Sequence, residues 1–210
     1  MNKFDRLDGV AAPMDVSNVD TDQIIPARYL SRARQDGFGE QLFHDLRFDD
    51  DGSQRPGFVL NFPAYKGASM LVADDNFGCG SSRESAVWAL MDFGIRVVIA
   101  TSFGDIFYNN SFKNGLLAIV LPKDTTASLR GALKDAKGPR PRLSVDLPAQ
   151  TVTAPDGKPI AFSIDPMRKE LLLQGMDEIT LTLKHAAEIA AFESNYDQDF
   201  SWLSNQQANK

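Results

Sequence analysis

The sequence predicts an α/β fold: a parallel sheet with crossover helices, joined to an antiparallel β element. Three short apolar runs, residues 68–74, 96–103 and 116–122, have the composition of buried strands. The stretches between them have helical character, and parallel strands need such crossovers. Residues 142–164 alternate in hydrophobicity around a Pro-Asp-Gly-Lys turn, which is typical of a hairpin. The resulting architecture is three-layered.

The first third of the chain has little regular pattern. Residues 5–30 mix a short apolar run with turn residues. Residues 31–58 are polar and glycine-bearing, and only residues 40–48 favour a short helix. The acids at positions 49–51 followed by Gly52 indicate an exposed turn.

Helices are expected around and after the apolar runs. Residues 82–94 have apolar side chains at helical spacing and end at Gly94, and residues 104–115 end at Gly115. Residues 126–136 predict a third helix, and residues 165–196 predict two more. We therefore expect one domain over residues 1–197 and a flexible polar tail over residues 198–210.

Composition limits the function classes. The net charge of −6 argues against nucleic acid and anionic membranes as partners. A single cysteine makes no intramolecular disulfide and cannot hold an iron–sulfur cluster alone. The start of the chain has no secretory signal pattern, and no apolar run is long enough to span a bilayer. We expect a soluble, cytoplasmic protein without a metal site of its own.

The stretch Asn-Phe-Gly-Cys-Gly-Ser-Ser-Arg-Glu, residues 76–84, joins a predicted strand to a predicted helix. Gly78 and Gly80 allow a sharp bend and close approach of a ligand. Ser81 or Ser82 would cap the helix, and Arg83 in its first turn offers a planar fork for a carboxylate or phosphate. The turn thus favours an anion site. A tight strand-to-helix turn with a serine cap is the alternative.

Other motifs fit this turn less well. Arg83 replaces the third glycine of the dinucleotide fingerprint, and the lysine of a P-loop is missing. The Gly-x-Ser-x-Gly elbow is also absent. Cys79 as a nucleophile would need a base, but His44 and His185 are remote in sequence; a small buried thiol is the alternative.

A second polar stretch lies upstream. Asp20, Thr21 and Asp22 could bind a divalent metal, but an Asx turn leading into a helix at Gln23 explains them as well. The arginines at positions 28, 32 and 34 follow in a polar loop. They are either solvated surface charges or a group that closes over an anionic substrate.

Three blocks together carry a resemblance: NVDTDQIIPARYL, NFGCGSSRE and SFGDIFYNNSFKNGLL. With LFHDLRF, FVLNFPAY, DFGIRVVIATSF and GMDEITLTLKHAAEIAAFE, the chain resembles the small subunits of bacterial 3-isopropylmalate dehydratase from about Phe4 to Glu193. These subunits are similar to the swivelling fourth domain of aconitase. The resemblance implies a hydro-lyase of leucine biosynthesis, which isomerises 2-isopropylmalate to 3-isopropylmalate by dehydration and rehydration.

The resemblance also implies a partner and a division of roles. A separate large subunit would hold the [4Fe-4S] cluster, in a heterodimer or heterotetramer. Ser81 matches the catalytic base. The remaining matches are Ser82, Arg83 and either Arg32 or Arg34 as substrate contacts, Tyr29 and Leu30 as readers of the substrate side chain, and Asp22, Thr21, Gly78 and Gly80 as residues that order the site.

Two alternatives stay open on the sequence alone. A small subunit that uses another substituted malate, methylated or of homocitrate type, would have much the same sequence. A carboxylate-binding module without catalysis is the alternative from a different functional class.

Overall fold

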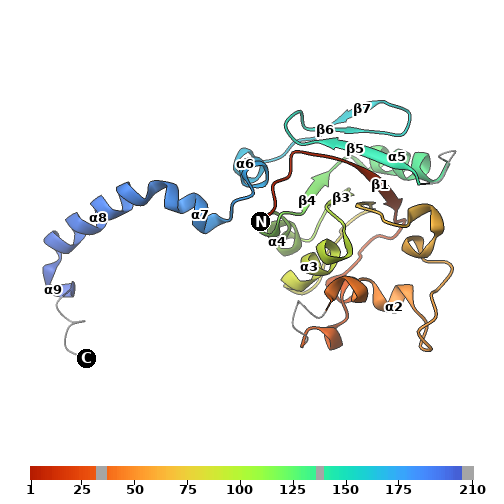
Figure 1. Cartoon of the computed structure of the whole chain (residues 1–210), viewed down its shortest axis with the longest axis horizontal. Helices are drawn as coiled ribbons and strands as arrows, with labels where there is room; N and C mark the ends of the chain where they lie inside the picture. The colour runs from red at the N-terminus through yellow and green to blue at the C-terminus, as the bar shows by residue number, and fades with distance from the viewer. Residues whose placement is uncertain (32–36, 136–139, 205–210) are drawn as a thin grey trace. The chain divides into compact units, whose positions relative to one another are not determined.

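The computed structural model describes residues 1–31, 37–135 and 140–204. Within these residues, seven strands form one mixed sheet in the order β4-β3-β2-β1-β5-β6-β7. The strands are β1 (Arg6–Pro13), β2 (Met70–Val72), β3 (Val97–Ala100), β4 (Leu117–Val120), β5 (Arg142–Asp146), β6 (Thr151–Thr153) and β7 (Pro159–Ala161). Strands β1 to β4 pair in parallel and β5 to β7 pair antiparallel. Figure 1 shows β5, β6 and β7 next to one another at the top of the view. The predicted fold class is confirmed.

The expected crossover helices are present. They are α3 (Glu84–Phe93), α4 (Asp105–Asn114) and α5 (Lys123–Asp135), and each connects one strand to the next in the chain. Gly94 and Gly115 end α3 and α4 in the left-handed conformation, as glycines after helices commonly do. The shorter elements of the first third are α1 (Thr21–Ile24), η1 (Ala27–Tyr29), η3 (Phe38–Gln41), α2 (His44–Arg47), η4 (Val59–Asn61) and η5 (Pro63–Tyr65).

Strand β1 corrects the expectation of an irregular first third. It lies at the centre of the sheet, parallel to β2 and antiparallel to β5. Gly9 and Pro13 resemble strand breakers, and the apolar residues between them are small. A Cβ at Gly9 would meet the hydroxyl oxygen of Ser69 at 2.0 Å, so a larger residue here would force that side chain to turn away. Long-range pairing therefore outweighs the weak local pattern.

Apolar side chains alternate between the two faces of the sheet. Ala12, Leu71 and Val98 belong to the hydrophobic cluster on one face. Their neighbours Ala11, Val72 and Ile99 belong to the cluster on the other. This period of two fixes the register of the central strands, because a shift by one residue would exchange the faces.

Contacts divide the chain into two compact units, Met1–Gly175 and Met176–Lys210. The first contains the sheet and ends with α6 (Pro166–Gln174). The second contains α7 (Glu178–Thr182), η6 (Leu183–His185), α8 (Ala186–Asp199) and α9 (Ser201–Ser204). A single domain over residues 1–197 stays a prediction. None of the helices in the described part of the chain is long and apolar enough to cross a membrane.

Candidate active site

The two polar stretches singled out in the sequence lie side by side. The segment after β1 and the turn after β2 are joined by a parallel bridge between Asp20 and Cys79. The Gly78 amide donates to the Val19 carbonyl at 2.7 Å, and the Thr21 amide donates to the Cys79 carbonyl at 2.9 Å. Since β1 and β2 are parallel neighbours, their carboxyl ends meet at one edge of the sheet, where ligands of α/β folds commonly bind.

Two glycines shape the turn for different reasons. Gly78 has a φ of +74°, and a Cβ there would penetrate the ring of Phe107 on α4. Gly104, the N-cap of α4, approaches just as closely, because its Cβ would come within 2.6 Å of the Gly78 carbonyl oxygen. Gly80 has a φ of +92°, but a Cβ would meet only ordinary contacts, the nearest at 3.5 Å. Packing requires the first glycine, and backbone conformation requires the second.

Ser81 and Ser82 follow the turn with exposed side chains. The buried Thr21 fixes the backbone here, since its hydroxyl donates to the Ser81 carbonyl at 3.1 Å. The side-chain hydroxyls of both serines are without a hydrogen-bond partner among residues 1–31, 37–135 and 140–204. The fold thus holds the backbone of Ser81 and leaves its hydroxyl available to a ligand.

Helix α3 begins later than expected. Its N-cap is Arg83, in extended conformation, and no side chain caps the helix. The expectations of a serine cap and of Arg83 in the first turn are both wrong, because Ser81 and Ser82 come two residues and one residue before the cap. The first amide groups of α3 therefore have no side-chain acceptor, and the helix end keeps its partial positive charge.

Arg83 is held by one acidic residue of α1. Its side chain is 19% exposed, and its guanidinium forms an ion pair with Asp22, whose side chain is 54% exposed. Asp20 has a different role: its carboxylate accepts from the Gln23 amide at 2.7 Å, and its own amide donates to the Gln23 side chain. This capping box explains Asp20 without a metal. The Asp-x-x-Gln pattern is the signal that identifies it in the sequence.

Sequence reasoning missed a residue that orients α3. Asn114, the last residue of α4, donates to the Glu84 carboxylate at 2.8 Å and accepts from the Trp88 indole at 2.8 Å. Both partners lie in the first turns of α3. No local pattern marks this residue, because its partners are 26 and 30 positions away.

The residues expected to read the substrate lie on or just after η1. Tyr29 ends η1 and Leu30 follows it, and both pack partly buried against the core. The Arg28 guanidinium lies 4.6 Å from the centre of the Tyr29 ring and pairs with Asp45, which lowers the pKa of that carboxyl. Arg32 and Arg34 lie outside the described residues.

The surroundings of Cys79 disfavour the thiolate that a nucleophile or a cluster ligand requires. Burial and the negative charge of Asp20 raise the pKa of its thiol. His44 packs against the rings of Tyr29 and Phe48. An iron–sulfur cluster needs several thiolates, and one cysteine with a disfavoured thiolate does not fit that requirement. Among the described residues, no group of three or more His, Cys, Asp or Glu side chains could hold a metal.

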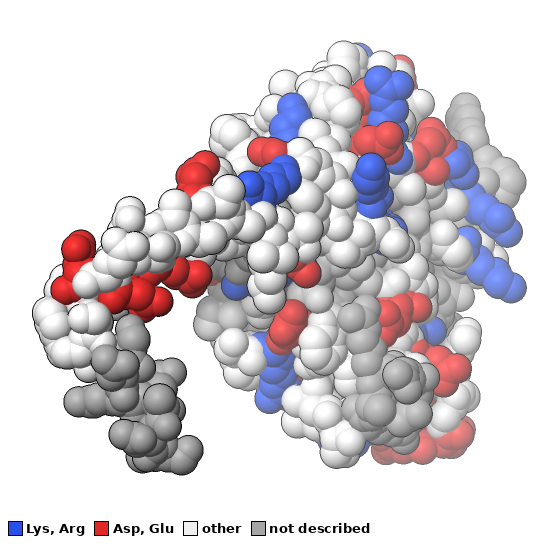
Figure 2. Space-filling model, turned by 60° about the vertical axis from the view of Figure 1, so that its left-hand side comes forward, with Lys and Arg blue, Asp and Glu red and all other residues white. Residues whose placement is uncertain are grey.

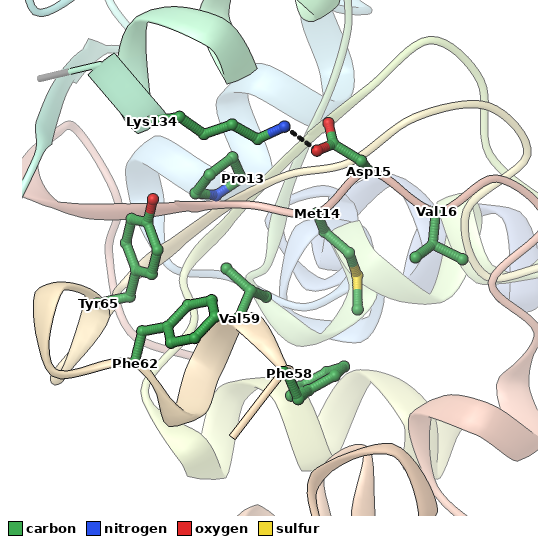
Figure 3. A pocket seen from close by; sticks show the side chains of 10 residues that line it. Pro13, Met14, Asp15, Val16, Phe58, Val59, Phe62, Tyr65 and Lys134 are labelled. Atoms are coloured by element: carbon green, nitrogen blue, oxygen red, sulfur yellow. Dashed lines mark hydrogen bonds and ion pairs between the residues drawn. The ribbon is translucent and has the colours of Figure 1, made fainter. Parts of the chain in front are cut away.

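A cavity of about 350 Å³ lies beside Pro13–Val16, the segment that follows β1. Figure 3 shows the aromatic side chains of Phe58, Phe62 and Tyr65 around it, with Lys134 facing Asp15 across an ion pair. None of the expected site residues lines this cavity. The candidate site is therefore the open turn at Ser81 and not this apolar cavity.

Comparisons with known proteins agree with the resemblance seen in the sequence. Residues 1–124 match the model of the Aconitase C-terminal domain, and residues 133–166 match LeuD_N. Residues 178–206 match the C-terminal domain of the 3-isopropylmalate dehydratase small subunit. The crystal structure of 3-isopropylmalate dehydratase from Methanocaldococcus jannaschii has a TM-score of 0.62 and 28% identity, covering 90% of this chain and 99% of that one.

Curated relatives cover nearly the whole chain. The 3-isopropylmalate dehydratase small subunit of Jannaschia sp. is 55% identical and that of Xanthobacter autotrophicus 54% identical, each over 97% of this chain and 100% of the relative. The small subunit of Caulobacter vibrioides is 54% identical over 97% of this chain and 99% of its own length. With the aconitase-type fold and both polar motifs in place, the chain belongs to the family of 3-isopropylmalate dehydratase small subunits.

Proposed function

We propose that the chain is the small subunit of a hydro-lyase of leucine biosynthesis that converts 2-isopropylmalate to 3-isopropylmalate through an alkene. One observation supports this most strongly. Two serine hydroxyls without partners among the described residues lie between a glycine turn and an uncapped helix start, next to an arginine held by an exposed carboxylate. This arrangement suits a dicarboxylate whose reacting carbon needs a base.

Arg83 is the proposed carboxylate anchor. In the free chain its guanidinium pairs with Asp22. A substrate carboxylate can take over this contact, because exposed ion pairs contribute only about 0–1 kcal/mol and exchange readily. The planar fork then offers two parallel hydrogen bonds that fix the substrate's orientation. Ser82, one residue before Arg83, adds a hydroxyl contact to the same carboxylate.

Ser81 is the proposed base. Its oxygen takes the proton from the substrate carbon next to the one that bears the hydroxyl. The C–O bond then breaks, and the hydroxyl leaves as water with a proton from solvent, which forms the alkene. In the second half, a water gives its hydroxide to the carbon that Ser81 deprotonated and its remaining proton to solvent, while Ser81 returns its own proton to the carbon that first bore the hydroxyl. A serine hydroxyl is a poor base at neutral pH. Its alkoxide needs donors such as the first amides of α3 and the Arg83 guanidinium.

The partner is proposed from the relatives' names and from the chain's composition. Each relative is named a small subunit, and one cysteine is too few for a cluster. We assign the [4Fe-4S] cluster to a large subunit, in a heterodimer or heterotetramer, and through it the assistance to the leaving hydroxyl. Tyr29, Leu30 and one of Arg32 and Arg34 are proposed to contact the substrate. A cytoplasmic location stays a prediction.

Reconstitution tests this proposal. The chain is purified anaerobically, alone and with its large subunit, and assayed for iron, sulfide and turnover of 2-isopropylmalate, a methylated malate and a homocitrate-type acid. We expect no cluster and no turnover for the lone chain, and turnover of 2-isopropylmalate by the complex. A stoichiometric cluster in the lone chain would refute the division of roles. Faster turnover of another acid would refute 2-isopropylmalate as the substrate. A stable complex that converts none of the three acids would support a carboxylate-binding module without catalysis.

A further inference from the structure

The C-terminal unit, residues 176–210, has no buried residue in its described part. Large apolar side chains nevertheless recur along its helices, and seven of them are between 36% and 72% exposed. These residues, here called the apolar stripe, are Ile179, Leu183, Ile189, Phe192, Tyr196, Phe200 and Trp202. The helices of this unit therefore bury none of these side chains among themselves, and large apolar side chains gathered on one exposed segment are typical of an interaction site.

Aromatic rings dominate the second half of the stripe. The rings of Phe192 and Tyr196 are 5.9 Å apart, those of Tyr196 and Phe200 4.7 Å, and those of Phe200 and Trp202 5.3 Å. The spacing of four residues keeps Phe192 and Tyr196 on one side of α8, and Phe200 is the C-cap of that helix. Tyrosine, tryptophan and phenylalanine are enriched in the buried centres of protein interfaces. A 14-residue helix is also marginal in water without tertiary packing, so α8 gains stability from a partner.

Charge indicates the chemistry of that partner. Residues 176–210 contain six acidic and two basic residues, a net charge of −4. Figure 2 shows acidic side chains gathered along this segment beside uncharged ones. The acids in α8 are Glu188, Glu193, Asp197 and Asp199. They would oppose an anionic membrane and favour an apolar groove with lysine and arginine at its rim.

The family matches indicate which protein bears the groove. Residues 1–124 match a domain described as the C-terminal domain of aconitase, which is therefore part of a longer chain there. Residues 178–206 match a separate model, described as the C-terminal domain of the dehydratase's small subunit. The relatives align over 97% of this chain, so they share most of this unit. The small subunits of these relatives, which carry the aconitase-like region, thus share most of this unit with the present chain.

A separate chain needs affinity that a covalently joined domain does not need. A linker of moderate length supplies an effective concentration in the millimolar range, and a free subunit must replace it with contact energy. We propose that the C-terminal unit is a docking element, whose apolar stripe packs into an apolar, basic-rimmed groove of the large subunit. This proposal rests on the proposed function, because it presupposes that the active enzyme includes such a large subunit.

The test uses full-length chain with Phe192→Ala and Tyr196→Ala together, titrated against the purified large subunit by calorimetry. We expect Kd to rise about 30-fold or more, as for a truncated interface hot spot. At saturating large subunit, kcat should stay within about twofold, because neither residue belongs to the proposed site. Met167→Ala, an equally exposed apolar residue of α6, is the matched control and should leave Kd unchanged.

Three results would overturn the proposal. The first is an unchanged Kd with normal helix content by circular dichroism. The second is a fall in the melting temperature of the lone double variant with unchanged Kd, which would show that the stripe packs on its own chain. The third is loss of self-association with unchanged Kd, which would identify a second copy as the partner. Binding is measured without turnover, so a complex that forms normally but does not convert 2-isopropylmalate refutes only the proposed function.

Discussion

Two arginines lie near the carboxyl ends of the parallel strands. They differ in how many protein groups pair with their guanidinium. Arg130 is 8% exposed and donates to the Ala73 carbonyl at 2.7 Å and to Asp15 at 2.8 Å, with Asp74 at 3.2 Å. Arg83 is held through the exposed carboxylate of Asp22. Three protein groups hold Arg130, whereas Asp22 is the ion-pair partner of Arg83 among the described residues, and we propose that the remaining donors of Arg83 bind substrate. On the proposed role of Arg83, a cation that binds a ligand differs from a structural one by its incomplete pairing within the protein and not by its charge alone.

The two glycines of the turn also differ in how strongly the surrounding protein constrains them. Substitution of Gly78 has the largest expected effect on stability. Gly78→Ala should lower the free energy of unfolding by about 2–5 kcal/mol, because the new methyl group collides with Phe107 at a positive φ. Gly80→Ala should cost only about 1–2 kcal/mol, from backbone conformation alone. Urea unfolding of the lone chain measures both. Equal costs would show that α4 does not constrain the turn.

Arg83→Lys tests the ligand side of the comparison. An ammonium cannot form the bidentate contact with a carboxylate, so kcat/KM of the reconstituted complex should fall by about 2–4 kcal/mol in transition-state stabilisation. The stability of the lone chain should change by less than about 1 kcal/mol, because the partner carboxylate is exposed. Near-native kcat/KM would make Arg83 a surface charge of α3.

Arg130→Met tests the structural side. Removing the guanidinium takes a buried donor from the Ala73 carbonyl and one of two cationic partners from Asp15, which keeps Lys134, and this should cost about 1–3 kcal/mol of unfolding free energy. The kcat per assembled complex should stay near native. A variant with native stability but lost turnover would reverse the roles assigned to the two arginines.

Substitution of Asp15 has the smallest expected effect on the free energy of unfolding, and this effect depends on pH. Burial opposes ionisation of this carboxyl, but hydrogen bonds and charges of Lys134 and Arg130 outweigh burial and lower its pKa. A carboxyl with a lowered folded-state pKa adds stability above its unfolded-state pKa of about 3.9, and loses it as the pH falls through the folded-state pKa. Stability should therefore decline below about pH 4, and Asp15→Asn should reduce that decline. Urea unfolding between about pH 3 and 7 measures it, and an identical profile in the variant would contradict the ion-pair account.

Local patterns were sufficient for part of the fold. The β2-α3-β3-α4-β4 region follows from apolar runs separated by helical stretches that end at Gly94 and Gly115. Strand β1 could not be predicted, because Gly9 and Pro13 argue locally against a strand. Only the long-range pairing with β2 and β5 makes these residues a strand. The division at Gly175 could not be predicted either. It depends on which residues contact one another in the fold, and the helical pattern of residues 165–196 carries no information on that.

The candidate site was predictable to a similar degree. Glycine spacing indicated the turn, and parallel topology explains why Asp22 meets Arg83. The start of α3 was misplaced because a serine beside a helix resembles a cap until the backbone is known. Asn114 could not be found, since its role depends on how α3 and α4 pack.

The most direct test of the central claim is kcat of the Ser81→Ala variant in the reconstituted complex. We predict a fall of at least about 100-fold, the low end for a positioned proton-transfer group. Stability and assembly should stay nearly native, because the Ser81 hydroxyl has no partner among the described residues. Ser82→Ala is the matched control and should raise KM more than it lowers kcat. If Ser81→Ala keeps more than about a tenth of kcat, Ser81 is not the base.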